Sequence, residues 1–472
     1  MEWTRCYTYD RPGEDPQSDP NRSTFERDWD RLIFSSAFRR LQNKTQVFPL
    51  PNEVFVHNRL THSLEVASVG RSLGSMVGEQ LVREEPEIAD HETSRDFYLN
   101  HLKTVIAAAC LAHDLGNPAF GHSGEDAISS FFQQNQDKLY ANKPLTKYYS
   151  KAEWKDLIRY EGNANAIRVL TKPKAELEHG EFQLCYTTLA AILKYPCTSG
   201  LNDKKLLHRK KYGVFQSERH ILQAVAERTG MQPDGGSGKQ LAYRRHPFVY
   251  LVEAADDICY SIIDLEDAHK LGILSYAECR ELLQPLCLLD EATTEAHLAQ
   301  RLAQFRDDHN AQIGYLRAKA INGLAKATVR QFIAHRRSIL AGTFTHSLVD
   351  ALNAELEQNG RPNVLKEVKN ISVQRIYNHS SVVRIELSGY RIFHGLLDVF
   401  LESTLLLGAG KGLSSYQEKA FGLIPSQFGI QETQSPYEKT LRLLDFLSGM
   451  TDPFALKLYR NLNGIETPGV HA

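Results

Sequence analysis

Apolar residues recur at three- and four-residue intervals along nearly the whole chain from residue 24 onward, which is the period of an α-helix. The stretches with this period fall at about 24–41, 60–83, 97–115, 123–138, 153–170, 182–194, 217–229, 246–270, 275–288, 293–322, 325–358, 390–408, 411–422 and 437–460. In a chain of 472 residues, such patterning predicts a mostly α fold whose helices pack around a large core.

Strand-like alternation is confined to one late stretch. Residues 370–390, NISVQRIYNHSSVVRIELSGY, hold two runs rich in β-branched residues on either side of Asn-His-Ser-Ser, which predicts a small late β-hairpin. The glycine-rich stretch 232–240 predicts a flexible loop. Residues 1–23 are rich in proline and aspartate and are expected to be extended.

The composition excludes several classes of protein. A formal net charge of −2 argues against nucleic-acid binding through bulk charge, although KKLLHRKK (204–211) and Arg336-Arg337 are local basic patches. The seven cysteines show no CxxC spacing and are expected to be reduced thiols. The N-terminus lacks a secretory signal pattern, and no apolar run approaches the ~20 residues of a membrane span. We therefore expect a cytoplasmic protein with no membrane partner.

Two of the predicted helices carry a histidine at the end of an apolar face. In the stretch 61–82, His62 heads a face that continues through Val66, Val69, Leu73, Val77 and Leu81. In the stretch that ends at residue 115, His113 completes the face of Leu102, Ile106 and Ala109. Asp114 follows His113, and Gly116-Asn117-Pro118 then predicts the end of the helix. Both histidines are expected to point inward.

A third predicted helix, within 246–270, places an aspartate on an apolar face. Asp256 shares this face with Val249, Val252, Tyr260 and Asp264. A carboxylate is costly to bury unless a cation pairs with it. Asp257 lies about a third of a turn away, so we expect Asp256 to be the inward residue.

Three inward helix faces therefore present His62, His113, Asp114 and Asp256. Two imidazoles and two carboxylates suit one divalent ion of intermediate softness, and manganese, magnesium, iron and zinc all match this donor set. Taken singly, a histidine on an apolar face is more often an ordinary core residue, and a His-Asp pair occurs by chance in many chains. The combination on three faces favours a metal site.

The segments that carry these residues resemble a known family. They are HNRLTHSLEVASVGRSLG, LAHDLGNPAFGHSGED and VEAADDICYSIIDLEDA, and the likeness extends to RLIFSSAFRRLQNKTQVF, YEGNANAIRVL and SGMTDPFALKLYRNLNG. The chain resembles the HD-domain superfamily, and within it the deoxyguanosinetriphosphate triphosphohydrolase (dGTPase) group of dNTP triphosphohydrolases. The resemblance implies that residues 24–270 form an HD-domain catalytic core, that 1–23 precede it as an N-terminal segment, and that 271–472 form a C-terminal helical region whose small β element completes the nucleotide site.

The resemblance also implies a role for each matching residue. His62, His113, Asp114 and Asp256 would be the metal ligands, while His122 and Glu125 would be the catalytic histidine and its acidic partner. Residues expected to bind substrate are Gln46, Val47, Arg59, Tyr260, Asp264, Tyr377 and Glu386. Of these, Arg59 would hold the α-phosphate region, Tyr260 and Asp264 would line the sugar site, and Tyr377 and Glu386 would lie near the base.

The implied reaction is metal-dependent hydrolysis of a dNTP, with dGTP as the expected substrate, at the α-phosphorus to deoxynucleoside and inorganic triphosphate. His122 would transfer a proton, and whether it acts as base or acid stays open. The cofactor would be one divalent ion per site, Mn²⁺ or Mg²⁺, with Fe²⁺ or Zn²⁺ as alternatives. Two other functions stay open: another HD-domain nucleotide phosphohydrolase or phosphodiesterase, and a nucleotide- or ssDNA-sensing protein with weak activity.

The resemblance has implications for partners as well. Members of the group are typically homo-oligomers, often hexamers, and some respond to ssDNA or to nucleotide effectors. No P-loop is present in the sequence, so a triphosphate would be bound by scattered lysines and arginines. The recognisable motifs begin near residue 24, and we therefore do not expect the N-terminal SAM domain of the vertebrate relative.

Overall fold

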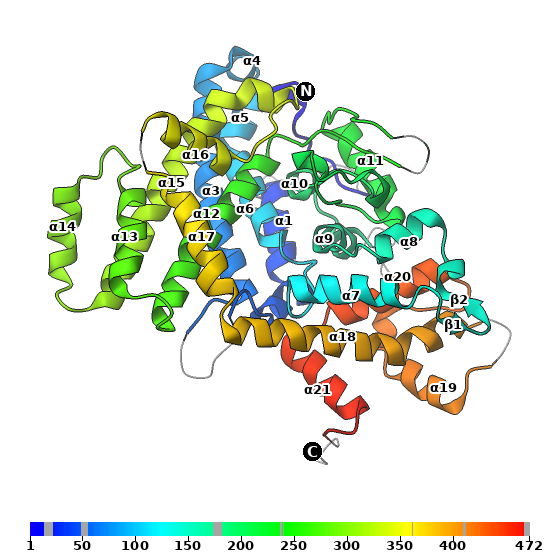
Figure 1. The fold of residues 1–472 in the computed structure, drawn as a ribbon. Coiled ribbons are helices and arrows are strands. Elements are labelled where there is room, and N and C mark those ends of the chain that lie inside the picture. Colours follow the sequence, from blue (N-terminus) through cyan, green and yellow to red (C-terminus); the bar gives the residue numbers. More distant parts are fainter. Residues whose placement is uncertain are drawn as a thin grey trace.

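The computed structural model describes residues 1–13, 22–48, 55–172, 182–236, 238, 240–360, 362–408 and 412–466. Within these residues the fold is mostly α, as the periodicity predicts (Figure 1). The one sheet that they contain is a two-stranded antiparallel ribbon of β1 (Leu139–Tyr140) and β2 (Lys143–Pro144). None of the helices in this part of the chain has the length and apolar character needed to cross a membrane.

The helices of the N-terminal half are α1 (Thr24–Ile33), α2 (Ser36–Arg40), α3 (Arg59–Glu84), α4 (Pro86–Ala89), α5 (Glu92–Asp96), α6 (Leu102–Ala112), α7 (His122–Gln134), α8 (Lys151–Leu157), α9 (Gly162–Thr171), α10 (Tyr186–Ile192) and α11 (Arg219–Arg228). The long helix α3 packs along α6, and α12 (Val249–Lys270) packs against both. These three helices form the centre of the molecule (Figure 1). Their contact faces are lined by fully buried apolar side chains such as Leu73, Ile106 and Ile262.

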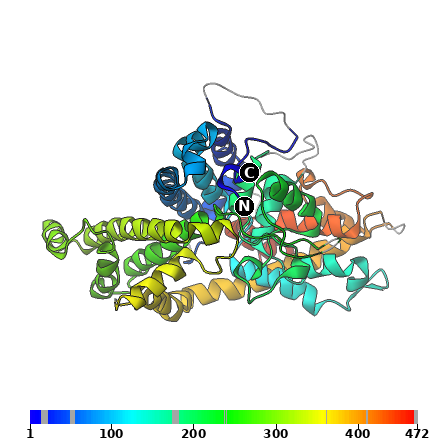
Figure 2. The ribbon, with the colours of Figure 1, turned by 90° about the horizontal axis from the view of Figure 1, so that it is seen from above.

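The remaining helices are α13 (Tyr276–Cys287), α14 (Glu295–Gln304), α15 (His309–Leu340), α16 (Leu348–Gln358), α17 (Val364–Ile371), α18 (Ser380–Leu406), α19 (Ser415–Gly422), α20 (Pro436–Ser448) and α21 (Asp452–Leu462). Helices α13 and α14 extend to one side of the molecule (Figures 1 and 2). On the other side, α18 runs beside α7, α20 and α21. A second core cluster fills the space between α7 and these late helices, separate from the one around α3, α6 and α12.

The predicted β-hairpin at 370–390 is wrong. The region is helical throughout: α17 continues into a π-helical turn, Ser372–Tyr377, and α18 begins at Ser380. The intervening Asn-His-Ser-Ser contains the N-cap of α18, because the His379 side chain accepts from the Ser381 N–H. The π-helical turn at Ser372–Tyr377 breaks the three- and four-residue spacing of apolar residues that identifies an α-helix. The same stretch is rich in β-branched residues, which favour strands, and so its sequence resembles a hairpin.

Several helix boundaries also differ from prediction. The stretch 153–170 is two helices, α8 and α9, because the chain turns between them. The break expected near residue 323 is absent, since α15 runs unbroken across it. Of the N-terminal segment, residues 14–21 lie outside the described part of the chain. The remainder is not merely extended: Trp3 is buried in a 3-10 turn, Trp3–Arg5, and packs against Tyr98.

Candidate active site

The N-terminal end of α3 brings the first candidate metal ligand to the centre of the molecule. Asn58 caps the helix by accepting from the Thr61 N–H, which satisfies one of the free donors of the first turn. Arg59 and His62 lie in the next turn, and both are buried. The helix then follows the predicted apolar face into the core, and so His62 points inward as the periodicity predicts.

His113 and Asp114 lie at the opposite helix end, where α6 stops. The Nδ1 atom of His113 is 2.6 Å from the Cys110 carbonyl oxygen. A carbonyl can only accept, so Nδ1 carries the proton of this hydrogen bond, and Nε2 faces the cluster with a free lone pair when the ring is neutral. Asp114 receives one bond on each oxygen, from Arg59 Nη1 and from Asn117 Nδ2, both at 2.6 Å.

Asp256 completes the cluster from α12. Its Oδ1 atom lies 3.2 Å from His62 Nε2 and 3.5 Å from His113 Nε2. The inward residue of the Asp-Asp pair is therefore the one that the helical face predicts. Donor atoms of His62, His113 and Asp114 all lie within 4.8 Å of one another, a spacing that one metal ion can bridge.

The pKa values of the clustered side chains indicate that the cluster favours positive charge. Burial opposes protonation of His113, but the carboxylates of Asp114 and Asp256 outweigh it and raise its pKa to about 9. Burial also opposes ionisation of Asp114, yet the positive charges of Arg59 and the two histidines lower its pKa to about 2. The cluster thus attracts positive charge, and two imidazoles with two carboxylates fit a divalent ion.

A turn that only glycine can form carries the chain from Asp114 to α7. A Cβ atom on Gly116 would lie 2.1 Å from both the Ala166 nitrogen and the Gly162 oxygen of α9. Asn165 Nδ2 donates to the Gly116 carbonyl at 2.7 Å. Two residues with positive φ, Phe120 and Gly121, then place His122 at the first position of α7.

His122 and Glu125 lie one helical turn apart beside the cluster. His122 Nδ1 is 3.9 Å from Glu125 Oε1, and 77% of the His122 side chain is exposed to solvent within the concave site. Neighbouring protein there displaces part of the water, and together with the charges of Lys211 and Arg59 it lowers the pKa of His122. Burial and the nearby carboxylate of Glu161 raise the pKa of Glu125.

Two cavities meet at the candidate metal ligands. The larger, about 490 Å³, is lined by Gln46, Val47, Arg59, Tyr260, Tyr377 and Glu386, together with Asp114, His122 and Asp256. Every predicted substrate-binding residue except Asp264 therefore lines one cavity. Asp264 is buried behind it and accepts a hydrogen bond of 2.8 Å from the Tyr377 hydroxyl. The Tyr377 ring in turn stacks on Tyr260, with ring centroids 5.5 Å apart.

The smaller cavity, about 230 Å³, brings in residues that are not among the predicted site residues. Lys194, Tyr195, Lys211 and Glu253 line it beside His113, His122 and Glu125. Lys211 Nζ lies 3.0 Å from Glu161 Oε1 and 3.9 Å from Glu125 Oε2. Lys211 belongs to the basic run 204–211, but neither lysine lies on a helix, so periodicity carries no signal for them.

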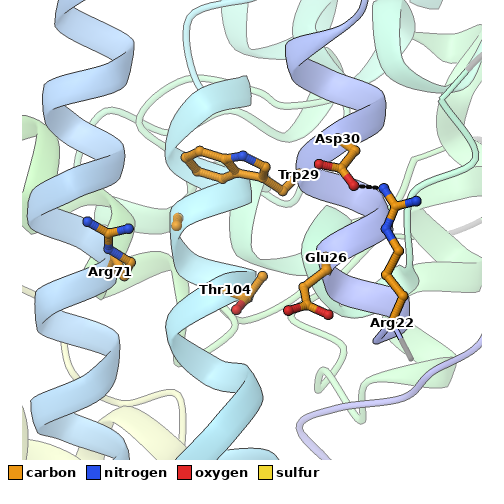
Figure 3. Close-up of a pocket in the computed structure, with 7 residues that line it drawn as sticks. Arg22, Glu26, Trp29, Asp30, Arg71 and Thr104 are labelled. Carbon is orange, nitrogen blue, oxygen red and sulfur yellow. Dashed lines mark ion pairs between the residues drawn. The ribbon is translucent and has the colours of Figure 1, made fainter. Parts of the chain in front are cut away.

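Some of the other basic residues singled out from the sequence form local pairs. His208 Nε2 lies 2.5 Å from Asp234 Oδ2, and Arg336 pairs with Glu84 and Glu85. A further cavity, about 380 Å³, lies between α1, α3 and α6, where Trp29 faces α6 and Arg71 approaches from α3 (Figure 3). It contains none of the predicted site residues, and Arg22 pairs with Asp30 at its edge.

Comparison with known proteins agrees with this geometry. Residues 59–194 match the HD domain, and residues 360–461 match the phosphohydrolase-associated domain. The first match contains His62, His113 and Asp114, and the second contains Tyr377, Glu386 and Asp452.

Curated relatives cover essentially the whole chain. A deoxyguanosinetriphosphate triphosphohydrolase-like protein of Synechocystis is 38% identical over 99% of this chain and 100% of its own. One from Pseudomonas aeruginosa is 37% identical over the same shares. The deoxyguanosinetriphosphate triphosphohydrolase of Salmonella typhimurium is 29% identical over 94% of each chain. The chain therefore belongs to the HD-domain phosphohydrolases, in the family of deoxyguanosinetriphosphate triphosphohydrolase-like proteins.

Proposed function

We propose that this protein hydrolyses dNTPs, with dGTP as the best substrate, at the α-phosphorus, releasing deoxynucleoside and intact triphosphate. The observation that carries the proposal is the meeting of two unlike cavities at the His-Asp cluster. The smaller holds the ammonium groups of Lys194 and Lys211 among several carboxylates, and the larger holds a stacked pair of tyrosines. A substrate whose phosphates enter the first and whose nucleoside enters the second has its α-phosphorus over the cluster.

The residues proposed to hold the metal are His62, His113, Asp114 and Asp256. Bound there, a divalent ion would polarise phosphoryl oxygens and lower the pKa of water. Manganese or magnesium is the proposed ion; iron and zinc match the same donors. Arg59 Nη1 lies 2.6 Å from Asp114 Oδ2, and Arg59 also lines the larger cavity. Its guanidinium can therefore neutralise a phosphate oxygen that lies close to the cluster.

Proton transfer is assigned to His122, with Glu125 as its partner. The lowered pKa of His122 leaves the imidazole neutral near pH 7. His122 Nδ1 and Glu125 Oε1 are 3.9 Å apart, so the Glu125 carboxyl group can orient the ring after a small side-chain adjustment. Lys194 and Lys211, on the wall of the smaller cavity, are proposed to bind the β- and γ-phosphates.

The nucleoside is proposed to lie in the larger cavity. The Gln46 Oε1 atom is buried there and has no hydrogen-bond partner in the described part of the chain, which suits contact with a sugar hydroxyl. Tyr260 lies one turn beyond Asp256 and can pack on the deoxyribose, where its ring leaves little room for a 2′-oxygen. Tyr377 and Glu386 are proposed to contact the base.

The test is an assay of the purified protein with each dNTP and with GTP, in Mn²⁺ or Mg²⁺, with products separated by ion exchange. We expect triphosphate from dGTP, no product from GTP, and no activity in His113→Ala. The matched control is His394→Ala, since His394 bonds Ser130 outside both cavities. Pyrophosphate or orthophosphate as the product would overturn the proposal and favour another phosphohydrolase or phosphodiesterase.

Oligomeric state and effectors remain predictions from the family resemblance, and the cellular location remains a prediction from the sequence. We propose a cytoplasmic homo-oligomer, a hexamer by that resemblance, with ssDNA or a nucleotide as effector. Light scattering of the purified protein, and assays with and without ssDNA or a second dNTP, test these points separately from the reaction.

A further inference from the structure

Asp452 connects the C-terminal region to two walls of the larger cavity. It is the first residue of α21, within the motif SGMTDPFALKLYRNLNG (448–464), and its side chain is buried. Its Oδ1 atom accepts from the Phe120 backbone N–H at 3.1 Å, and its Oδ2 atom accepts from the Thr45 backbone N–H at 3.0 Å. One carboxylate thus joins the segments of Thr45 and Phe120, which are 75 residues apart in the sequence.

The first of these segments leads into the proposed substrate contacts. Thr45 is followed by Gln46 and Val47, which line the cavity. It also pairs with Asn58 in an antiparallel bridge, and the Arg59 N–H donates to the Lys44 carbonyl at 3.2 Å. The position of Thr45 is therefore tied to the helix start that carries Arg59.

The second segment leads into the proposed catalytic histidine. Phe120 has a φ of 61°, a left-handed conformation that costs a bulky residue free energy, and Gly121 has a φ of 59°. His122 follows at once as the first residue of α7. The bond from Asp452 offsets part of this strain, so it stabilises the backbone conformation that aims His122 into the site.

A neighbouring lysine strengthens the same junction. Lys44 is buried, and its Nζ donates to the carbonyls of Asn117 and Ser448 at 2.6 and 2.8 Å. The segment from Ser448 to Asp452 therefore contacts both the turn after Asp114 and the strand-like segment at Thr45. Its bonds reach the two cavity walls but none of the four candidate metal ligands.

We propose that Asp452 is a positioning residue for the reaction. It fixes the separation between the Thr45–Val47 wall and the Phe120–His122 wall, and thereby holds His122 at the substrate that the other wall contacts. This inference rests on the proposed function. An ordinary acidic residue in the first turn of a helix would instead contribute only a favourable interaction with the helix dipole.

The variant that tests this is Asp452→Asn, which keeps the shape of the side chain but turns an N–H donor toward one of the two backbone N–H groups. The matched control is Glu295→Gln, which removes the same charge at the first position of α14, away from the site. Since misplacement of a reacting group by about 1 Å costs about 100-fold in rate, we expect kcat for dGTP to fall at least about ten-fold in D452N. KM and Mn²⁺ affinity should stay within about two-fold, and E295Q should resemble the wild type.

Hydrogen exchange adds a readout that needs no activity. In the wild-type protein the amides of Thr45 and Phe120 should be protected, and at least one should exchange about ten-fold faster in D452N, with the amides within α21 unchanged. Fast exchange of both amides in the wild type overturns the inference even if D452N fails to fold. So does a D452N kcat within two-fold of wild type, or an equal loss of Mn²⁺ affinity. A wild type that hydrolyses no dNTP contradicts the proposed function, whereas the exchange result still decides whether Asp452 holds the two walls.

Discussion

The hydroxyl of Tyr377 donates a 2.8 Å hydrogen bond to Oδ2 of Asp264, which links the end of a π-helical turn to the buried face of α12. Tyr377 lines the larger cavity and stacks on Tyr260. Asp264 does not line the cavity, so its contact with the cavity wall is through the hydroxyl of Tyr377.

Replacing Tyr377 by Phe removes the partner of a buried carboxyl while it keeps the ring. We expect the free energy of unfolding to fall by about 1–3 kcal/mol, because Asp264 is left without this bond. Thermal and denaturant unfolding measure the change. Tyr416→Phe is the control, since Tyr416 is 67% exposed and its substitution should change stability by less than about 0.5 kcal/mol. Equal stability of both variants would contradict the role given to Asp264.

Gly116→Ala should be strongly destabilising. The added Cβ would meet backbone atoms of α9 at 2.1 Å, and neither backbone can move without displacing the turn that carries Asp114 and Asn117. We expect a loss of more than about 2 kcal/mol. Gly314→Ala, in the second turn of α15 with open space around it, should instead stabilise by about 0.5–1 kcal/mol. If Gly116→Ala left the free energy of unfolding unchanged or increased it, as is expected for Gly314→Ala, the close contact between Gly116 and α9 would not be the reason for glycine at this position.

Lys211 should control the protonation of His122. Its positive charge lowers the pKa of His122, so Lys211→Met should raise that pKa and extend the protonated form to higher pH. The same change should raise the pKa of Glu125 further, because Lys211 opposes the effects of burial and of Glu161. NMR titration of the His122 ring protons measures the first effect without any assay. Lys210→Met is the control, and an unchanged His122 titration in K211M would contradict the electrostatic account.

Metal binding should release protons. The pKa of His113 is about 9 in the cation-free cluster, so at pH 7 the ring carries a proton that an ion at Nε2 must displace. Apparent Mn²⁺ affinity should therefore increase as pH rises from 6.5 toward 9, by up to about ten-fold per pH unit. Calorimetry in buffers of different ionisation enthalpy counts the protons. His113→Gln should lose the release together with most of the affinity, and pH-independent affinity in the wild type would contradict the assignment.

Helix faces predicted the centre of the site because they follow directly from the spacing of apolar residues. His62 and Asp256 lie on long helices, and the structure brings His62 Nε2 and Asp256 Oδ1 within 3.2 Å of each other. The choice of Asp256 over Asp257 needs nothing beyond the 3.6-residue period. That these residues bind a metal ion follows from the helix faces and from the family resemblance, and it remains a prediction.

Other parts of the site depend on tertiary contacts that leave no periodic signal. Lys194 and Lys211 lie outside the helices, so their convergence on one cavity follows only from the packing of loops. Asp452 acts on backbone N–H groups more than 300 residues away, a contact that no local pattern encodes. The hairpin expected at 370–390 is absent: Ile376 and Val382 are buried on a helical surface, where packing outweighs their intrinsic β propensity, while Val373 stays exposed.

Attack at the α-phosphorus over the His-Asp cluster is tested most directly by hydrolysis of dGTP in ¹⁸O-labelled water. Mass spectrometry of the products should find one ¹⁸O atom in the released triphosphate and none in the deoxyguanosine, with Mn²⁺ required and no reaction in His113→Ala. Label in the deoxyguanosine would mean attack at carbon, and labelled orthophosphate or pyrophosphate would mean attack at another phosphorus. Either result would contradict the account of how the two cavities hold the substrate.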